Sequence, residues 1–166
     1  MQPPSPLPSA LSTCSVLLLA GGRGQRMGGQ DKGLLDWHGQ PLIAHLHALT
    51  RPLSDDLIIS CNRNAERYSA YADRVVHDSE GDFPGPLAGI ASCLPLLPAG
   101  WVLITPVDTP QLPTHLGEQL WQGLMASNSQ SRMAVAGMGD DTHWLHMLVH
   151  TDLADGLRQR LLAGER

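Results

Sequence analysis

An apolar run that leads into a glycine-rich loop constrains the fold of this chain most strongly. Residues 15–20 (SVLLLA) are almost continuously apolar, which predicts a strand buried on both faces. The segment 21–29 that follows holds five glycines. Because glycine permits positive φ and lets backbone N–H groups approach a ligand closely, this strand and loop predict phosphate binding at the carboxyl end of the strand.

Short apolar runs alternate with helical patterns along the rest of the chain. We expect further strands at residues 56–60, 74–77, 101–105, 132–136 and 144–149, and helices at 41–51, 62–71, 86–97 and 113–126, with Asp152 capping a last helix. This alternation predicts a three-layer α/β/α fold with a mostly parallel, Rossmann-like sheet. Ligands bind beyond the carboxyl ends of strands in such sheets, so the loops after residues 20, 77 and 105 should meet at one edge.

Composition narrows the class of protein. The 166 residues suffice for one domain, and the net charge of −5 argues against a nucleic-acid surface. No apolar run approaches the ~20 residues needed to cross a membrane. The three cysteines form no CxxC pair, which favours the reducing cytoplasm. The proline-rich residues 1–13 are expected to be a disordered leader, which leaves one domain at 14–166.

Lys32 is the only lysine, and it stands directly behind the glycine-rich loop. Two familiar phosphate motifs do not fit this loop. Met27 occupies the third glycine position of the Rossmann fingerprint, while Asp31 and Gly33 flank the lysine where a P-loop needs Gly and Ser or Thr. The loop is therefore either a different phosphate cradle or an ordinary charged surface turn.

Four further charged residues fit nucleotide chemistry. Arg23 and Arg26 in the loop could grip a triphosphate as bidentate forks, or be solvated. Asp108, in the PVDTP segment, could bind Mg²⁺, which prefers one or two carboxylates plus substrate phosphates, or could form an Asx turn. Asp78 begins an acidic loop, so its own role is less distinct. Together these residues predict an enzyme that handles nucleotides.

Five segments together resemble the molybdenum cofactor guanylyltransferases. They are LLAGGRGQRMGGQDKGLL (18–35), PLIAHL (41–46), NRN (62–64), DSEGDFPGPLAGI (78–90) and PVDTP (106–110), and the resemblance runs from about Val16 to Arg166. It implies a nucleotidyltransferase sheet and transfer of GMP from GTP to molybdopterin-bound molybdenum, with release of pyrophosphate. The alternatives are a sister enzyme that uses CTP or a sugar-phosphate acceptor, and a non-catalytic GTP-binding module.

The resemblance also implies roles for particular residues. Lys32 and Asp108 would be catalytic, and Asp108 would bind Mg²⁺. The GTP-binding residues would be Leu19, Ala20, Gly21, Gly22, Arg23, Arg26, Lys32, Ser60, Asn62, Asp78, Gly85, Pro86, Gly89 and Asp108. The family often has asparagine where Ser60 stands.

The remaining expectations concern the acceptor, the partners and the end of the chain. His143, His146 and His150 have a spacing that could suit zinc, but a strand there favours packing or pterin contact. The resemblance implies a cytoplasmic protein that contacts pterin-delivering or molybdoenzyme-maturation proteins, and neither nucleic acid nor membrane. Family members usually continue past the AGER segment, so the domain is expected to lack its last strand and helix.

Overall fold

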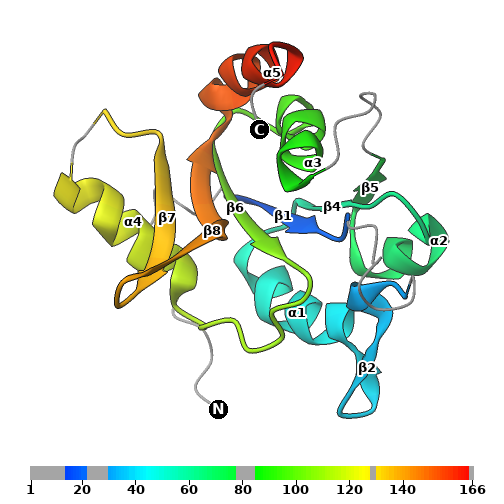
Figure 1. The fold of residues 1–166 in the computed structure, drawn as a ribbon. Coiled ribbons are helices and arrows are strands. Elements are labelled where there is room, and N and C mark those ends of the chain that lie inside the picture. The colour runs from blue at the N-terminus through cyan, green and yellow to red at the C-terminus, as the bar shows by residue number, and fades with distance from the viewer. Residues whose placement is uncertain (1–13, 22–29, 78–84, 128–129, 165–166) are drawn as a thin grey trace.

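The computed structural model describes residues 14–21, 30–77, 85–127 and 130–164. Six strands form one sheet in the order β5-β4-β1-β6-β8-β7 (Figure 1). They are β1 (Ser15–Leu19), β4 (Leu57–Ser60), β5 (Arg74–Val76), β6 (Trp101–Pro106), β7 (Met133–Met138) and β8 (Asp141–His150). The first four strands are parallel, whereas β8 runs antiparallel to both β6 and β7. The expected mostly parallel sheet is confirmed.

Helices cover both faces of this sheet. They are α1 (Leu42–Thr50), α2 (Ala65–Tyr68), α3 (Pro86–Cys93), α4 (Leu116–Ser127) and α5 (Ala154–Leu162). Side chains of α1 and α4 pack in one apolar cluster, and those of α3 and α5 pack in a second cluster. The two pairs lie on opposite sides of the strands in Figure 1, which confirms the three-layer α/β/α prediction.

The central strand β1 shows why its sequence is apolar at every position. All five of its residues are buried, with Val16 and Leu18 in the α1/α4 cluster and Leu17 and Leu19 in the α3/α5 cluster. Burying one leucine side chain stabilises the fold by about 1.5–3 kcal/mol. A strand with helices on both faces therefore needs apolar residues rather than an alternating pattern.

Between β1 and β5 the structure differs in two elements from those that the sequence predicted. A hairpin of β2 (Asp36–Trp37) and β3 (Gln40–Pro41) precedes α1 and was not predicted. His38 and Gly39 both have positive φ, as the two central residues of a type I′ hairpin turn require. The helix expected at 62–71 is shorter, because it begins at Ala65 and continues after Tyr68 only as a 3₁₀ turn.

The prediction that Asp152 caps the last helix is wrong. Asp152 lies inside a 3₁₀ turn (Thr151–Leu153), and the N-cap of α5 is Leu153, which makes no side-chain capping bond. The Asp152 carboxylate instead lies 3.0 Å from His150 Nδ1 and 3.6 Å from Arg132 Nε. The extra turn carries the aspartate away from the start of α5, so its charge pairs with side chains at the ends of β7 and β8.

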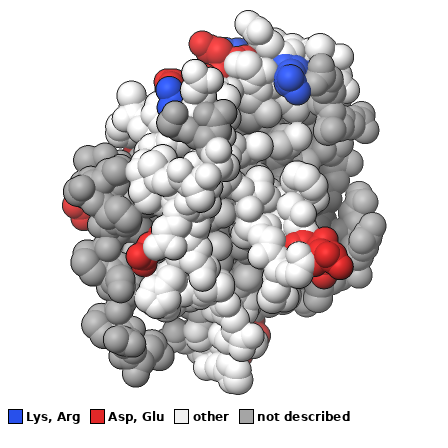
Figure 2. All heavy atoms as spheres, turned by 90° about the vertical axis from the view of Figure 1, so that its left-hand side faces the viewer, with Lys and Arg blue, Asp and Glu red and all other residues white. Residues whose placement is uncertain are grey.

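One side of the molecule carries few charged groups. Figure 2 shows the side that includes α4 and β7, with only scattered Lys, Arg, Asp and Glu among the described residues. Large apolar side chains are exposed on these elements and on β8, including Met125, Met133, Met138 and Trp144. Within the described ranges, no helix is long and apolar enough to cross a bilayer.

Candidate functional site

The carboxyl ends of the parallel strands are joined by backbone hydrogen bonds that continue beyond the strands. The Ala20 amide donates to the Ser60 carbonyl (2.8 Å), and the Val107 amide donates to the Leu19 carbonyl (3.1 Å). The loops that follow β1, β4 and β6 therefore leave the sheet side by side. This is the edge at which parallel α/β sheets bind their ligands.

Lys32 and Asp108 meet at this edge, although they are 76 positions apart in the sequence. The Lys32 Nζ lies 3.3 Å from Asp108 Oδ2, and their side chains are 51% and 42% exposed. An ion pair this exposed contributes only about 0–1 kcal/mol to stability, because water and salt screen it. The two charges therefore add little to folding and remain accessible to a charged ligand.

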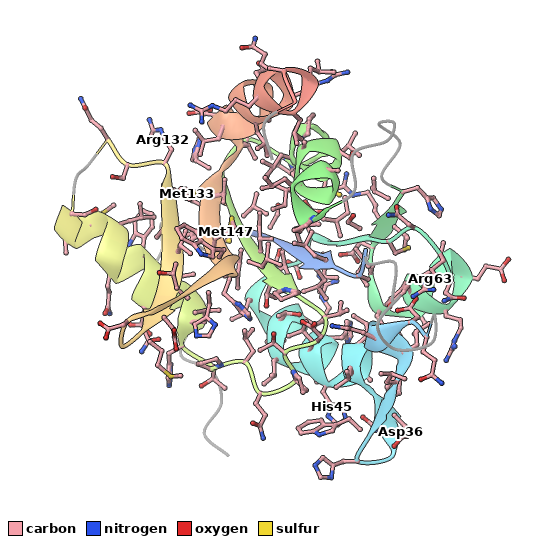
Figure 3. All side chains as sticks on the ribbon, viewed as in Figure 1. Asp36, His45, Arg63, Arg132, Met133 and Met147 are labelled. Carbon is pink, nitrogen blue, oxygen red and sulfur yellow. The ribbon has the colours of Figure 1, made fainter. Side chains whose placement is uncertain are left out.

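Buried contacts of Asp31, the residue before the lysine, fix this part of the chain. Asp31 Oδ1 accepts a 2.5 Å hydrogen bond from the Tyr68 hydroxyl, and Oδ2 accepts a 2.9 Å bond from Asn64 Nδ2. The Arg63 guanidinium, seen beside α2 in Figure 3, has its Nε 3.8 Å from Oδ2 and donates to the Gln30 carbonyl. The Asp31 side chain is 7% exposed, and sequence reasoning gave it no role.

The same contacts explain the protonation of Tyr68. Burial, followed by the hydrogen bond to Asp31, raises the pKa of the Tyr68 phenol well above its usual range. The phenol therefore keeps its proton and remains a hydrogen-bond donor at every physiological pH. In the sequence, the one indication that Asp31 has a role of its own is that it stands where a P-loop requires glycine.

Gly33, the residue after the lysine, is pressed between α2 and the end of β6. A Cβ at this position would lie 2.5 Å from Tyr68 Oη and 2.8 Å from Val107 Cγ2. Both distances are shorter than a carbon atom can tolerate, so only glycine fits. The serine or threonine of a P-loop is excluded here for a steric reason.

Apart from those at the start of α3, the other predicted nucleotide-binding residues fall into two groups. Gly22, Arg23, Arg26 and Asp78 lie outside the described residues. Leu19, Ala20, Gly21, Ser60 and Asn62 lie in or shortly after β1 and β4. The Ala20 amide already donates to the Ser60 carbonyl, so it is engaged within the fold.

The start of α3 forms a further part of this end of the molecule. Gly85 is the N-cap with φ +146°, a conformation that favours glycine, and Pro86 occupies the first turn. Gly85 and Pro86 are exposed, whereas Gly89 is buried in the helix. Helix α3 contacts strand β1.

The three histidines near the carboxyl end do not gather at one point. His146 Nε2 lies 3.1 Å from Thr109 Oγ1, next to Asp108, while His150 contacts Asp152. Burial and then the nearby His143 lower the pKa of His146, and Asp108 acts in the opposite direction. No group of three or more His, Cys, Asp and Glu residues is placed to hold a metal within the described ranges.

Asp108 nevertheless suits a metal that a substrate helps to hold. Its carboxylate is exposed, and one of its oxygens faces Lys32. Mg²⁺ commonly binds through one or two carboxylates and completes its shell with water and substrate phosphates. The described residues thus fit a magnesium site that a bound triphosphate completes, and do not fit a site built from protein ligands alone.

The family model that matches this chain defines its class as the NTP transferases, and two solved structures share the fold. A crystal structure of molybdopterin-guanine dinucleotide biosynthesis protein A from Archaeoglobus fulgidus covers 92% of this chain and 75% of its own, with TM-score 0.72 and 24% identity. A nucleotidyl transferase from Methanothermobacter thermautotroptrophicus covers 90% and 76%, with TM-score 0.70 and 20% identity. At these identities the two structures establish the fold.

The sequence comparisons identify the family. The family model of the MobA-like NTP transferase domain matches residues 16–166, and this chain belongs to that family. A relative from Pseudomonas aeruginosa, named molybdenum cofactor guanylyltransferase, is 53% identical over 158 residues. That alignment covers 95% of this chain and 79% of the relative.

Proposed function

We propose that this protein transfers GMP from GTP to molybdopterin-bound molybdenum cofactor and releases pyrophosphate. The observation that carries the proposal is the 3.3 Å approach of Lys32 to Asp108 at the carboxyl ends of β1 and β6. It is supported by relatives of about half-identical sequence that are named molybdenum cofactor guanylyltransferase. These names give no support to a CTP-dependent enzyme, a sugar-phosphate acceptor or a non-catalytic module.

The chemistry assigned to the protein is positioning and charge neutralisation. Phosphoryl transfer leaves little covalent work for side chains, so fixed charges next to the reacting phosphates carry most of the catalysis. Lys32 presents a compact ammonium that binds phosphate oxygens and offsets the charge that develops on the leaving pyrophosphate. Strand β1 and the start of α3 flank the place where the nucleotide would lie.

Asp108 is the proposed Mg²⁺ ligand in this scheme. A magnesium ion bound there would supply positive charge next to the triphosphate. The acceptor is itself a phosphate, so the protein needs no serine, cysteine or histidine nucleophile. His146, beside Thr109 and Asp108, lies on the side that we assign to the pterin substrate.

A titration with four nucleotides tests the proposed function. The melting temperature is measured with GTP, CTP, ATP and UTP, each with and without Mg²⁺, and GTP with Mg²⁺ should raise it most. Transfer of labelled GMP to molybdenum-loaded molybdopterin is then followed together with pyrophosphate release. A preference for CTP, or GTP binding without any transfer, would contradict the proposal.

Two variants make the test specific to the site. Asp108→Asn should remove the effect of Mg²⁺ on nucleotide binding and abolish transfer. Asp155→Asn, which alters an exposed carboxylate on α5, should behave like the wild type. Equal Mg²⁺ dependence in both variants would place the metal elsewhere.

The setting of the reaction is also a proposal. Cys14, Cys61 and Cys93 are buried and are not joined by disulfides, which supports a reducing cytoplasm. The labile pterin would reach the site from a delivering protein and leave towards a molybdoenzyme. Cross-linking in cytoplasmic extract, with Lys32→Ala as a substrate-binding control, checks this expectation.

A further inference from the structure

Resting on the proposed function, we infer that Asp31 is the positioning residue for Lys32 and that it acts through Tyr68. Asp31 does not reach the reacting groups itself. Its carboxylate fixes the backbone on one side of the lysine, so that the ammonium faces Asp108.

The first argument is the way in which Asp31 is buried. A carboxylate that is only 7% exposed is costly to the fold unless hydrogen bonds and opposite charge compensate it. Tyr68 and Asn64 each donate one bond to it, and Arg63 lies 3.8 Å away. All three partners belong to α2 or to the loop that enters it, so Asp31 joins the lysine segment to this one rigid element.

The second argument is the continuity of the contacts on the other side of the lysine. Gly33 lies against both the Tyr68 hydroxyl and Val107, and Val107 directly precedes Asp108. Tyr68 and Val107 are buried in the same apolar cluster. Tyr68 thus contacts the residues before and after Lys32, and Val107 ties this segment to the loop that carries Asp108.

The third argument is that the charge pair cannot position itself. Lys32 and Asp108 are both about half exposed, and such pairs hold their geometry weakly. The lysine stem has four rotatable bonds, so the position of its Cα has to be set by neighbouring buried residues. Among the described contacts, those of Asp31 and Gly33 meet this requirement.

The kinetic test compares Asp31→Asn and Tyr68→Phe with two matched controls. Asp56→Asn removes a carboxylate that, like Asp31, accepts hydrogen bonds from a side-chain hydroxyl (Ser15) and from another side chain (Arg74). Asp56 lies directly before β4, at the end of the strand opposite to the proposed site. Tyr71→Phe removes a neighbouring phenol hydroxyl. Both site variants should lower kcat by about 10- to 100-fold, the loss expected for a misplacement near 1 Å, and both controls should keep the wild-type kcat.

The decisive comparison repeats Asp31→Asn in the Lys32→Ala protein. If Asp31 acts through Lys32, removing it from a protein that lacks the lysine should change kcat by less than about 2-fold. An equal loss in both backgrounds, or no loss in the wild-type background, would overturn the inference. Circular dichroism and urea unfolding of each variant separate lost positioning from lost folding, and Tyr68→Phe provides the second variant if Asp31→Asn does not fold.

A second readout does not depend on turnover. Because Lys32 is the only lysine, ¹³Cε-lysine labelling gives one side-chain NMR signal. Replacing Asp108 by asparagine should shift this signal in the wild type, and should shift it much less in Asp31→Asn and Tyr68→Phe. If Asp108→Asn shifts the lysine signal as much in these variants as in the wild type, the positioning role is refuted, whether or not the protein transfers GMP. If the shift is smaller in these variants but the wild-type protein shows no transfer activity, the proposed function is refuted and the positioning role stands.

Discussion

Gly33 offers a direct test of the packing that brings Lys32 to Asp108. In Gly33→Ala, the new Cβ would lie 2.5 Å from Tyr68 Oη and 2.8 Å from Val107 Cγ2. Tyr68 is 0% exposed and its hydroxyl is bonded to Asp31, while Val107 is 4% exposed, so neither atom can move aside cheaply. Overpacking of this kind costs about 1–3 kcal/mol. If Tyr68 turns away instead, its hydrogen bond to the charged Asp31 is lost at a cost of about 1.5–3 kcal/mol.

Urea unfolding at constant m-value measures this effect, with Gly123→Ala as the matched control. Gly123 lies inside α4 and has no atom within 4 Å of an added Cβ, so alanine there should stabilise the protein by about 0.5–1 kcal/mol. Gly33→Ala should instead lower the free energy of unfolding and reduce Tm by roughly 2–4 °C for each kcal/mol lost. If Gly33→Ala is as stable as the wild type, or is stabilised like Gly123→Ala, the close packing around Gly33 is wrong.

Further predictions concern the charged pair, a buried hydroxyl and a histidine. Lys32→Ala should change the free energy of unfolding by less than about 1 kcal/mol, because its ion pair with Asp108 is exposed. The same variant should weaken GTP binding, measured by calorimetry, by about 1.5–3 kcal/mol, and an unchanged GTP affinity would contradict the phosphate role of Lys32. Thr105→Val should leave the protein equally stable or more stable by about 1 kcal/mol in urea, because the buried Thr105 hydroxyl has no partner among the described residues; a clear destabilisation would reveal one. Burial and His143 lower the pKa of His146 in the folded protein below the value of 6.5 expected for the unfolded chain. Neutral His146 therefore leaves the stability of the fold intact above pH 6.5, and this stability is lost as the pH falls through the lower folded pKa. His146→Gln should therefore lose less stability than the wild type between about pH 7 and 5, and parallel curves would argue against this assignment.

The sequence predicted the sheet well because buried parallel strands leave a simple signal. The runs around Val16, Ile58 and Leu103 are short and continuously apolar, and each became a strand with helices on both faces. The approach of Lys32 and Asp108 followed from the rule that loops after parallel strands share one edge. Both inferences depend on local pattern and topology alone.

The features that sequence reasoning missed depend on particular tertiary contacts. Nothing around Asp31 indicates that its carboxylate is buried against Tyr68, since the partner is 37 positions away. The β2–β3 hairpin is only two residues per strand, too short for an alternating pattern, and its His38–Gly39 turn is not one of the strongest hairpin signals. Asp152 has the right residue type for a cap, but an intervening 3₁₀ turn gives that position to Leu153.

A crystal structure of the protein with GTP and Mg²⁺ tests the central claim most directly. The account predicts that the triphosphate lies at the carboxyl ends of β1 and β6, with the Lys32 ammonium bonded to phosphate oxygens and Asp108 bound to the magnesium ion. The opposite result is a nucleotide bound in another part of the molecule, or bound at this edge with Lys32 and Asp108 still paired to each other and touching neither phosphate nor metal. Either observation would contradict the assignment of these two residues.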